Sequence, residues 1–416
     1  MDPATKQKKQ NKGSEPRSTL TVNGRVVMRR RRYHSEAEGS STPSDDLLDA
    51  MNKTISQATL ELCVQLNRAS RSFVMTSEHL KAAAQLSLSH ELMRQEVERE
   101  GKAALALARS GELQPTWRAA DCKVPAKAPV EVAGKASVEA PAEKSRVYVS
   151  SDGFTAPTVT DAEKHARREK TIEKRKLREG PKRPLPPVKP GSDGRYKEFK
   201  TVMFFDQNLK HRHVSVTRGD CDALGRIMMR DAGRLEFKVA DERLGLIDGG
   251  PWIINQFKQR GLKTTAVGLD FYHLGDNVHK TRRIVFGEAN DEKNDPGSTS
   301  ASDLMHTVKH EGYEPLRQKL MELRAKHRGA KREEIDRLIE YASDRREMIR
   351  YPEFIANDWH IGSGAMESEC GVIPFRVKGQ GKRWDSENAE AIMALEALHQ
   401  SGQAVAYRQL AMSGRN

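Results

Sequence analysis

The stretch GLIDGGPW, residues 245–252, decides the fold that this chain can adopt. An apolar run ends in the acid Asp248, two glycines follow, and a helix-compatible segment extends from 251 to 260. This pattern predicts a buried strand that carries Asp248 to its C-terminal end, where the glycines allow the backbone to turn sharply. Because ligands and catalytic groups gather at that edge of helix-covered sheets, we expect functional side chains around Asp248.

Two more acids are placed to join Asp248. Asp152 follows a strand-like segment, 146–151, and Glu367 follows the glycine-rich stretch 362–364 at the start of a predicted helix. Two strand-end aspartates and one helical glutamate predict a divalent-metal site, because Mg²⁺ typically binds one or two carboxylates together with substrate phosphate oxygens. Two such ions can activate water or a 3′-hydroxyl and stabilise the leaving oxygen.

The order of the predicted elements indicates an α/β fold, a mixed sheet with helices. Asp206 also ends a predicted strand, so it stays an alternative to Asp152 as the first acid. Residues 287–300 are predicted as a loop, 301–350 as an all-helical insertion, and 386–400 as a helix that packs against the sheet. Strand patterns fall at 146–151, 198–206, 211–217, 243–248 and 264–269, and helical patterns at 220–239 and 251–260.

The composition of the whole chain indicates a polyanionic partner. Lys and Arg exceed Asp and Glu by 71 − 58 = 13, and the isoelectric point is near 9.5. We infer a nucleic acid rather than charge for solubility alone, because the basic residues are also clustered. No apolar run approaches the roughly 18 residues of a membrane helix, and the N-terminus has no signal-peptide pattern. The four cysteines are widely spaced and indicate neither a disulfide framework nor a zinc motif, so a cytoplasmic protein is predicted.

The N-terminal part combines a basic hairpin with helices. Residues 1–18 are polar and are predicted to be a disordered arm. A hairpin with an Asn23–Gly24 turn leads into four arginines, which would contact phosphates without base specificity or form only a solvated strand end. Helical periodicity then covers 45–107, with a helix at 77–86, a break, and a longer helix from Ser89. This order fits a DNA-binding helix-turn-helix and equally a plain helical bundle. The four arginines are Arg29, Arg30, Arg31 and Arg32.

A second basic segment follows the first predicted acid. Residues 119–144 contain three prolines and are predicted to be an extended linker. After the strand that ends at Asp152, the segment 163–195 is rich in Lys and Arg and lacks the apolar periodicity of a core helix. We predict that it contacts the DNA backbone near the active site, with a solvated loop as the alternative. The contact residues are predicted to be Lys174, Arg175 and Lys176.

Several motifs, taken together, resemble one protein family. They are Ser151–Asp152–Gly153, Ile247–Asp248–Gly249–Gly250–Pro251–Trp252, Leu269–Asp270–Phe271–Tyr272–His273, Gly362–Ser363–Gly364 with Glu367, and Gly381–Lys382–Arg383–Trp384. In this order the chain resembles bacterial insertion-sequence transposases of the DDE class, on the Mutator-like branch, from residue 145 to residue 400. The resemblance implies an RNase H-like sheet with Asp152, Asp248 and Glu367 as the metal-binding triad. It also implies that Asp270 and His273 support the site without completing the triad.

The resemblance further implies the chemistry and the partners. The triad would hold two Mg²⁺ or Mn²⁺ ions; water would attack a phosphodiester at the element's end, and the freed 3′-hydroxyl would then attack target DNA. No covalent protein–DNA intermediate is expected, because no Tyr or Ser nucleophile motif is present. Synapsis of the terminal inverted repeats implies a homo-oligomer at the bacterial nucleoid. Trp252 and Arg383 are further candidates for DNA contact, Trp252 by stacking on a base or, alternatively, as a core residue.

The sequence departs from the family at one place, because residues 33–39 lack the cysteines of a zinc motif, and no zinc is predicted there. Two other functions stay open: an RNase H-like nuclease that cuts without joining, and a transposase-derived DNA-binding protein that is no longer catalytic. The predicted domains are a disordered arm (1–18), a hairpin and helical DNA-binding region (19–118), a linker (119–144), the first part of the RNase H-like domain (145–286, with the basic excursion 163–195), a helical insertion (287–352) and the C-terminal part of the RNase H-like domain (353–416).

Overall fold

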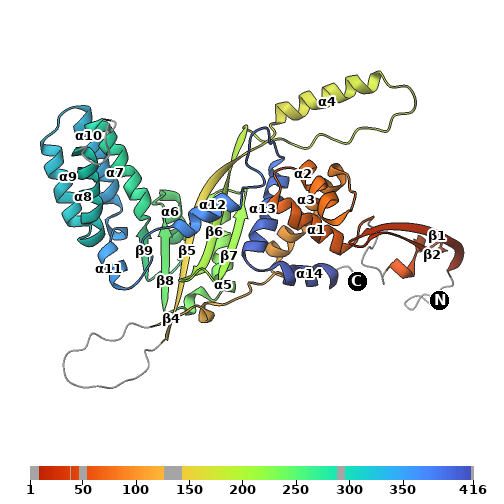
Figure 1. Cartoon of the computed structure of the whole chain (residues 1–416), viewed down its shortest axis with the longest axis horizontal. Helices are drawn as coiled ribbons and strands as arrows, with labels where there is room; N and C mark the ends of the chain where they lie inside the picture. The colour runs from red at the N-terminus through yellow and green to blue at the C-terminus, as the bar shows by residue number, and fades with distance from the viewer. Residues whose placement is uncertain (1–8, 38, 46–53, 126–142, 288–295, 414–416) are drawn as a thin grey trace. The chain divides into compact units, whose positions relative to one another are not determined.

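The computed structural model describes residues 9–37, 39–45, 54–125, 143–287 and 296–413. These residues form a mixed α/β protein with fourteen α-helices, a three-stranded sheet and a mixed six-stranded sheet (Figure 1). The chain divides into two compact units. We call them the N-terminal unit (Met1–Leu113, Phe375–Glu396 and Ala404–Asn416) and the sheet unit (Gln114–Pro374 and Ala397–Gln403).

The six-stranded sheet confirms the predicted α/β class and the predicted strands. Its main path runs β7-β6-β5-β8-β9, with β5–β6 and β6–β7 antiparallel and β5–β8 and β8–β9 parallel. The path strands are β5 (Glu143–Pro157), β6 (Tyr196–Asp206), β7 (Arg212–Thr217), β8 (Glu242–Ile247) and β9 (Ala266–Leu269). A short strand, β4 (Lys123–Pro125), pairs with the start of β5. The linker prediction is therefore wrong for 119–125, where Ala119 and Cys122 are buried in the core; residues 126–142 lie outside the described part.

Two strands of the sheet continue beyond the others as a ribbon. β5 and β6 pair as far as Pro157 and Tyr196, whereas the pairing of β8 with β5 ends at Val149. The pairing of β7 with β6 begins at Lys200, which lies opposite Gly153. We call residues 153–157 and 196–200 the β5–β6 ribbon. Asp152 therefore lies inside a long strand and not at its end as predicted, because β6 continues the pairing after β8 has stopped.

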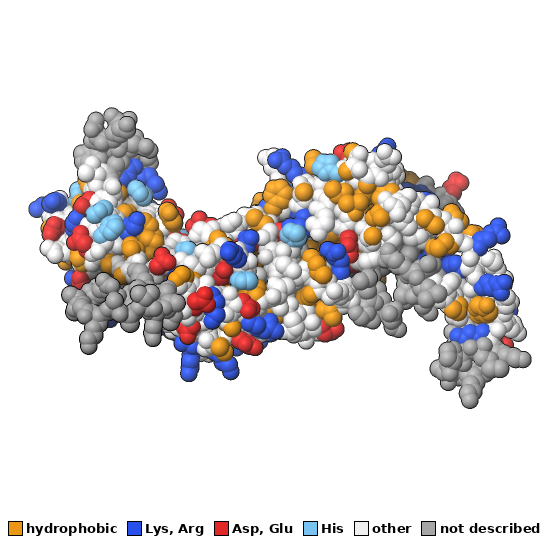
Figure 2. Space-filling model, turned by 60° about the horizontal axis from the view of Figure 1, so that its bottom comes forward, with side chains coloured by type: hydrophobic (Ala, Val, Ile, Leu, Met, Phe, Trp, Pro, Cys, Tyr) orange, Lys and Arg blue, Asp and Glu red, His pale blue; other side chains and the backbone are white. Residues whose placement is uncertain are grey.

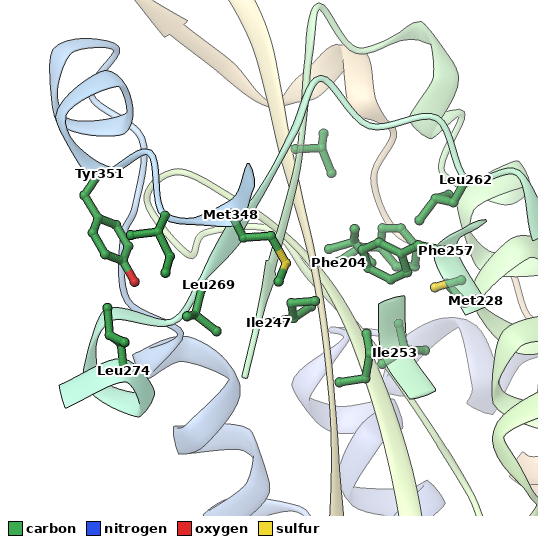
Figure 3. Packing of buried hydrophobic residues seen from close by; sticks show 14 of the residues in the cluster. Phe204, Met228, Ile247, Ile253, Phe257, Leu262, Leu269, Leu274, Met348 and Tyr351 are labelled. Atoms are coloured by element: carbon green, nitrogen blue, oxygen red, sulfur yellow. The ribbon is translucent and has the colours of Figure 1, made fainter. Parts of the chain in front are cut away.

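The helices bury one continuous apolar core against this sheet. The helices around the sheet are α5 (Cys221–Arg234), α6 (Pro251–Arg260) and α12 (Gly364–Val372). The predicted helical insertion is confirmed as α8 (Pro296–His310), α9 (Tyr313–Ala325) and α10 (Ala330–Asp344), between α7 (Phe271–Phe286) and α11 (Tyr351–Ala356). Ile247, Leu269, Met348 and Tyr351 belong to the same cluster as Phe257, so the insertion shares the core of the sheet (Figure 3). The loop predicted for 287–300 ends early, because α8 begins at Pro296.

The N-terminal unit contains a long hairpin and a helical group. The hairpin is β1 (Gln10–Thr21) and β2 (Gly24–Ser35), with β3 (Gly39–Ser41) beside β2. The helices are α1 (Gln57–Ala69), α2 (Phe73–Ala84), α3 (His90–Ser110), α13 (Ser386–Gln400) and α14 (Ala404–Ser413). The prediction of disorder is wrong for 10–18, because strand pairing with β2 satisfies this polar backbone without apolar burial. Residues 1–8, and residues 46–53 of the helix predicted from 45, lie outside the described part.

Most of α13 packs in the N-terminal unit, so its predicted packing against the sheet is wrong for residues 386–396. Arg68 and Arg109 of the N-terminal helices form ion pairs with Glu396 and Glu390 at 2.6 and 2.7 Å. A Cβ on Gly101 of α3 would lie 2.3 Å from the Ala391 carbonyl oxygen, so glycine allows the two helix backbones to approach closely. The charged pairs and this close contact hold α13 on α1 and α3. The segment 353–416, predicted to be one part of the sheet domain, is therefore divided, because residues 375–396 and 404–416 belong to the N-terminal unit.

No helix in the described part of the chain is long and apolar enough to cross a membrane.

Candidate metal centre

The sheet brings the first two predicted acids level with each other on adjacent strands. β5 and β8 are parallel, and Val149 pairs with Gly245, a difference of 245 − 149 = 96. Asp152 and Asp248 differ by the same 248 − 152 = 96, one residue beyond the end of β8. Adjacent strands lie about 4.8 Å apart, so the two carboxylates share one edge of the sheet. Burial and the charge of Asp152 both raise the pKa of Asp248, which shows that the two acids interact.

The glycines after Asp248 form the sharp turn that the sequence predicts. Gly249 has φ +82, and a Cβ at this position would lie 2.6 Å from Leu269 Cδ1 and 2.7 Å from Arg345 Nε. Arg345 donates two hydrogen bonds to the Gly249 carbonyl oxygen, at 3.1 and 2.9 Å. The Gly250 N–H donates to Asp248 Oδ1 at 2.7 Å, immediately before α6 begins at Pro251. The turn therefore fixes the backbone and one oxygen of Asp248.

Glu367 reaches the same region from helix α12. Met366 and Glu369 of α12 are buried, and the Cys370 thiol donates to Asp152 Oδ2 at 3.2 Å. Glu367 lies on the open side of the helix with 51% of its side chain exposed. Its Oε1 is 3.9 Å from His273 Nδ1. Helix α12 therefore has one side in the core and presents the Glu367 carboxylate toward His273.

Asp270 is fully buried and joins the starts of two helices. Its Oδ1 accepts hydrogen bonds from the backbone N–H groups of Tyr272, at 2.6 Å, and His273, at 3.0 Å, at the start of α7. Its Oδ2 accepts from the N–H and the hydroxyl of Ser363, the residue before α12. Burial raises the pKa of Asp270, but the hydrogen bonds from His273 and Ser363 outweigh it and lower the pKa to about 2. Asp270 therefore positions the helix that carries Glu367.

His273 lies among the carboxylates as a cation. Its Nδ1 is 3.7 Å from Asp270 Oδ1, an ion-pair distance rather than a hydrogen bond. The interaction with Asp270 raises the pKa of His273 to about 9 against the opposing effect of burial, and the charges of Asp248 and Glu367 add to the rise. Asp270, His273 and Glu367 each offer a ligand atom within 4.8 Å of the others. Because the oxygens of Asp270 already accept four hydrogen bonds, we assign it to support rather than to metal ligation.

Asp152, Asp248 and Glu367 match a Mg²⁺ site in the chemistry of their donors, whereas the ligand atoms that lie within 4.8 Å of one another among the described residues belong to Asp270, His273 and Glu367. All three offer carboxylate oxygens, the ligands that Mg²⁺ prefers. Within the described residues, neither Asp152 nor Asp248 forms an ion pair with Lys or Arg, and the negative charge of Asp152 raises the pKa of Asp248. A divalent cation would neutralise this repulsion. We define these three residues as the candidate metal centre.

Asp206, the alternative first acid, lies at the other end of β6. It pairs with Val147, whereas Asp152 pairs with Thr201, five residues away (206 − 201). Five residues of strand correspond to about 17 Å. Asp206 Oδ1 accepts a hydrogen bond from the His211 N–H at 3.0 Å in the turn before β7. Asp206 is therefore a turn residue outside the candidate metal centre.

The four predicted arginines of the hairpin divide between two faces of β2, because successive strand residues point to opposite sides. Arg30 and Arg32 share Glu15 of β1, with N–O distances of 2.7 and 3.9 Å. Arg29 and Arg31 are exposed on the other face. On the face shown in Figure 2, Lys and Arg side chains lie interspersed with acids. On this face the positive charge is therefore mixed with negative charge and does not form one patch.

The remaining predicted DNA contacts have different surroundings. Arg175 of α4 (Asp161–Lys176) donates to the Arg183 carbonyl oxygen, whereas Lys174 and Lys176 are exposed. Trp252 packs against the core, and Lys200 Nζ lies 5.6 Å from its ring centre. Arg383 is half-buried in the N-terminal unit. DNA contact by these residues stays a prediction.

Sequence reasoning did not assign functions to Ser363, Arg345 and Cys370. Ser363 lay inside the G-S-G motif, where a serine before a predicted helix is a signal for a hydrogen-bonding residue. Arg345 and Cys370 had no such signal, since their contacts are with residues far away in the chain.

No protein-family profile matches this sequence, and no curated protein matches it. The functional assignment therefore depends on the geometry of the candidate metal centre.

The raised pKa of His273 predicts a pH-dependent stability of the metal-free protein. Protonated His273 is favoured in the folded state, so this stabilisation is complete below pH 6.5 and is lost as the pH rises through about 9. We expect the urea midpoint of the wild type to fall over this range, and to fall less in His273→Gln. Equal pH dependence in the two proteins would contradict the assignment.

Proposed function

We propose that this protein is a metal-dependent DNA transposase of the DDE class, with an RNase H-like sheet. The observation that carries the proposal is the level position of Asp152 and Asp248 on adjacent parallel strands, beside His273, whose charge interacts with both Asp248 and Glu367. The sheet order β7-β6-β5-β8-β9, with α12 packed near β5, supports the RNase H-like assignment. The net charge of +13 supports DNA as the substrate.

Asp152, Asp248 and Glu367 would hold two Mg²⁺ or Mn²⁺ ions by their carboxylate oxygens. When bound, such ions activate an attacking water or 3′-hydroxyl and stabilise the leaving oxygen. The protein's own contribution is orientation: Cys370 and the Gly250 N–H each fix one carboxylate oxygen. His273, as a cation, compensates part of the negative charge of the cluster. Asp270 holds the start of α12 through Ser363 and so keeps Glu367 in place.

The proposal includes the partners that the chemistry requires. The substrates would be the terminal inverted repeats of a transposon and a target duplex, at the bacterial nucleoid. Joining two ends to one target needs two active sites, so the active form would be a homo-oligomer. Arg29 and Arg31, on the exposed face of β2, would contact phosphates of the repeat.

The test is cleavage and strand joining on DNA that carries the element's own ends, with Mg²⁺ or Mn²⁺. Wild type would be compared with Asp152→Asn and Glu367→Gln, and with Asp206→Asn as the control. We expect metal-dependent joining in the wild type and the control, and none in the two triad variants, all of which should still bind DNA. Cutting without joining would make the protein a nuclease, and binding without cutting would make it a DNA-binding protein; either result overturns the proposal.

A further inference from the structure

Helix α4 is the most exposed helix of the sheet unit and is attached directly to the strand that carries Asp152. None of its 16 residues is buried. Figure 1 shows the helix beyond the ends of strands β5 and β6. A capping box between Thr160 and Glu163 fixes its start. Its base is tied to the chain that returns to β6, because the Ser192 N–H donates to the Val159 carbonyl oxygen at 2.9 Å and Gly191 N–H donates to Asp161 Oδ1 at 2.9 Å. The helix is therefore a fixed arm and not a loose loop.

One face of α4 is occupied by the proline-rich return segment, residues 181–190. Lys164 Nζ donates to the Pro190 carbonyl oxygen at 2.9 Å, and Arg168 donates to the Pro186 carbonyl oxygen at 2.6 Å. Arg175 donates in the same way to Arg183. These three side chains are half-buried and recur at helical spacing. They hold the return segment along the helix and are not available for another ligand.

A second face of α4 is basic, and its side chains have no bonding partner in the part of the chain that the structure describes. Arg167, Lys170 and Lys174 follow the i, i+3, i+7 spacing of one helix face, and all three are exposed. Within the described residues, none of these side chains forms an ion pair or a hydrogen bond. We call them the free basic face of α4. Lys176 is exposed on a different side, so the predicted trio of 174–176 divides among three sides of the helix.

The β5–β6 ribbon sets the position of the free basic face of α4 relative to the candidate metal centre. Asp152 lies at the base of the ribbon, and Pro157 at its end is five residues further, or about 17 Å of strand. α4 begins four residues beyond Pro157. The arm therefore projects from the edge of the sheet where the candidate metal centre lies. A duplex with one phosphate at that centre has phosphates about five steps away, about 17 Å, at the distance where the ribbon ends and the arm follows, because each strand carries a charge about every 3.4 Å.

We infer that the free basic face of α4 holds the backbone of the duplex that flanks the cleavage site, without reading its sequence. The inference rests on the proposed DNA substrate. From Arg167 to Lys174 the helix rises about 10 Å, a length that spans several phosphates of one strand. Lys and Arg side chains directed at phosphates give affinity and orientation and carry no base specificity. The excess of base over acid on this face gives the complementary charge.

The test is the salt dependence of DNA binding by the full chain without metal. The probes are two duplexes of unrelated sequence, each about 30 base pairs, titrated between about 50 and 200 mM salt. We compare wild type, Arg167→Gln/Lys170→Gln/Lys174→Gln, and a matched control, Lys182→Gln/Arg183→Gln/Lys189→Gln. The control removes the same one arginine and two lysines from exposed positions of the return segment. Because α4 buries none of its residues and the control positions are exposed, the melting temperature should be unchanged in both variants.

We expect the first triple variant to flatten the slope of log K against log salt by about 2.7, that is 0.9 for each of three lost phosphate contacts, equally on both duplexes. The control should keep the wild-type slope. An unchanged slope in the first variant, or an equal loss in the control, would overturn the inference. Loss on only one duplex would also overturn it, because it would show sequence recognition. Binding is measured without metal or catalysis, so a failure of the strand-joining test does not change the outcome of this experiment. The two failures can therefore be distinguished.

Discussion

Asp248→Asn is expected to reduce metal-dependent DNA cleavage by about 10³-fold or more while DNA binding is retained. Asp248 lies level with Asp152 on adjacent parallel strands, and the charge of Asp152 raises the pKa of Asp248. An amide keeps the shape of the side chain and one oxygen, but it lacks the negative charge that a divalent metal requires. The measurement is the single-turnover cleavage rate with saturating protein, so that a binding defect cannot mimic the loss.

The same substitution should leave the fold intact or stabilise it. Burial and the charge of Asp152 raise the pKa of Asp248, so its ionised form costs folding free energy above that pKa. Asparagine removes this cost and can still accept the Gly250 N–H. We therefore expect a metal-free melting temperature at neutral pH equal to or above that of the wild type. Mg²⁺ at ten times its Kd should add about 1.4 kcal/mol to the stability of the wild type, and much less to that of Asp248→Asn.

The control for this prediction is Asp206→Asn, the same chemical change about 17 Å away along β6. Asp206 accepts a hydrogen bond from His211 in a turn, and an amide oxygen can accept it as well. Its cleavage rate and its stabilisation by Mg²⁺ should match the wild type. If Asp206→Asn lost activity and Asp248→Asn kept it, the candidate metal centre would be assigned to the wrong residues.

Asp270→Ala is expected to lower the free energy of unfolding by about 3–5 kcal/mol, the largest stability effect of any substitution in the cluster. The carboxylate of Asp270 is buried and accepts hydrogen bonds from Tyr272, His273 and Ser363. Alanine leaves these donors without an acceptor in the protein interior and removes the cap of α7. The unfolding free energy from urea denaturation of the metal-free protein measures the effect. Ser363→Ala, which removes one donor only, should cost about 1 kcal/mol.

Asp270→Asn and Asp248→Asn form a matched pair, because the same change has opposite expected effects on stability. Hydrogen bonding lowers the pKa of Asp270 to about 2 from an ordinary 3.8. This corresponds to about 2 kcal/mol of stability, which is present above pH 3.8 and is lost as the pH falls through 2. Asp270→Asn should lose this contribution at neutral pH, and Asp248→Asn should not. Two variants of equal stability would show that the two carboxylates do not differ as described.

Much of the local structure could be predicted from the sequence. The apolar run before Asp248 and the two glycines after it form a strand and a turn, because their preferences act between neighbouring residues. The helices that begin at Pro251 and near Glu367 were predicted for the same reason. The errors concern pairing over long distances: 10–18 form a strand because β2 lies beside them, and 386–396 pack on α3 rather than on the sheet.

The sequence alone determined which residues are acids at the ends of apolar runs and where the positive charge is concentrated. Only the tertiary structure decided between Asp152 and Asp206, because the register of β5 against β8 brings one acid to Asp248 and leaves the other at the opposite end of β6. The hydrogen bonds from Ser363 to Asp270 and from Cys370 to Asp152 join residues 93 and 218 positions apart. Such contacts follow from how strands and helices bury their apolar faces together, a condition on the whole chain that no local pattern contains.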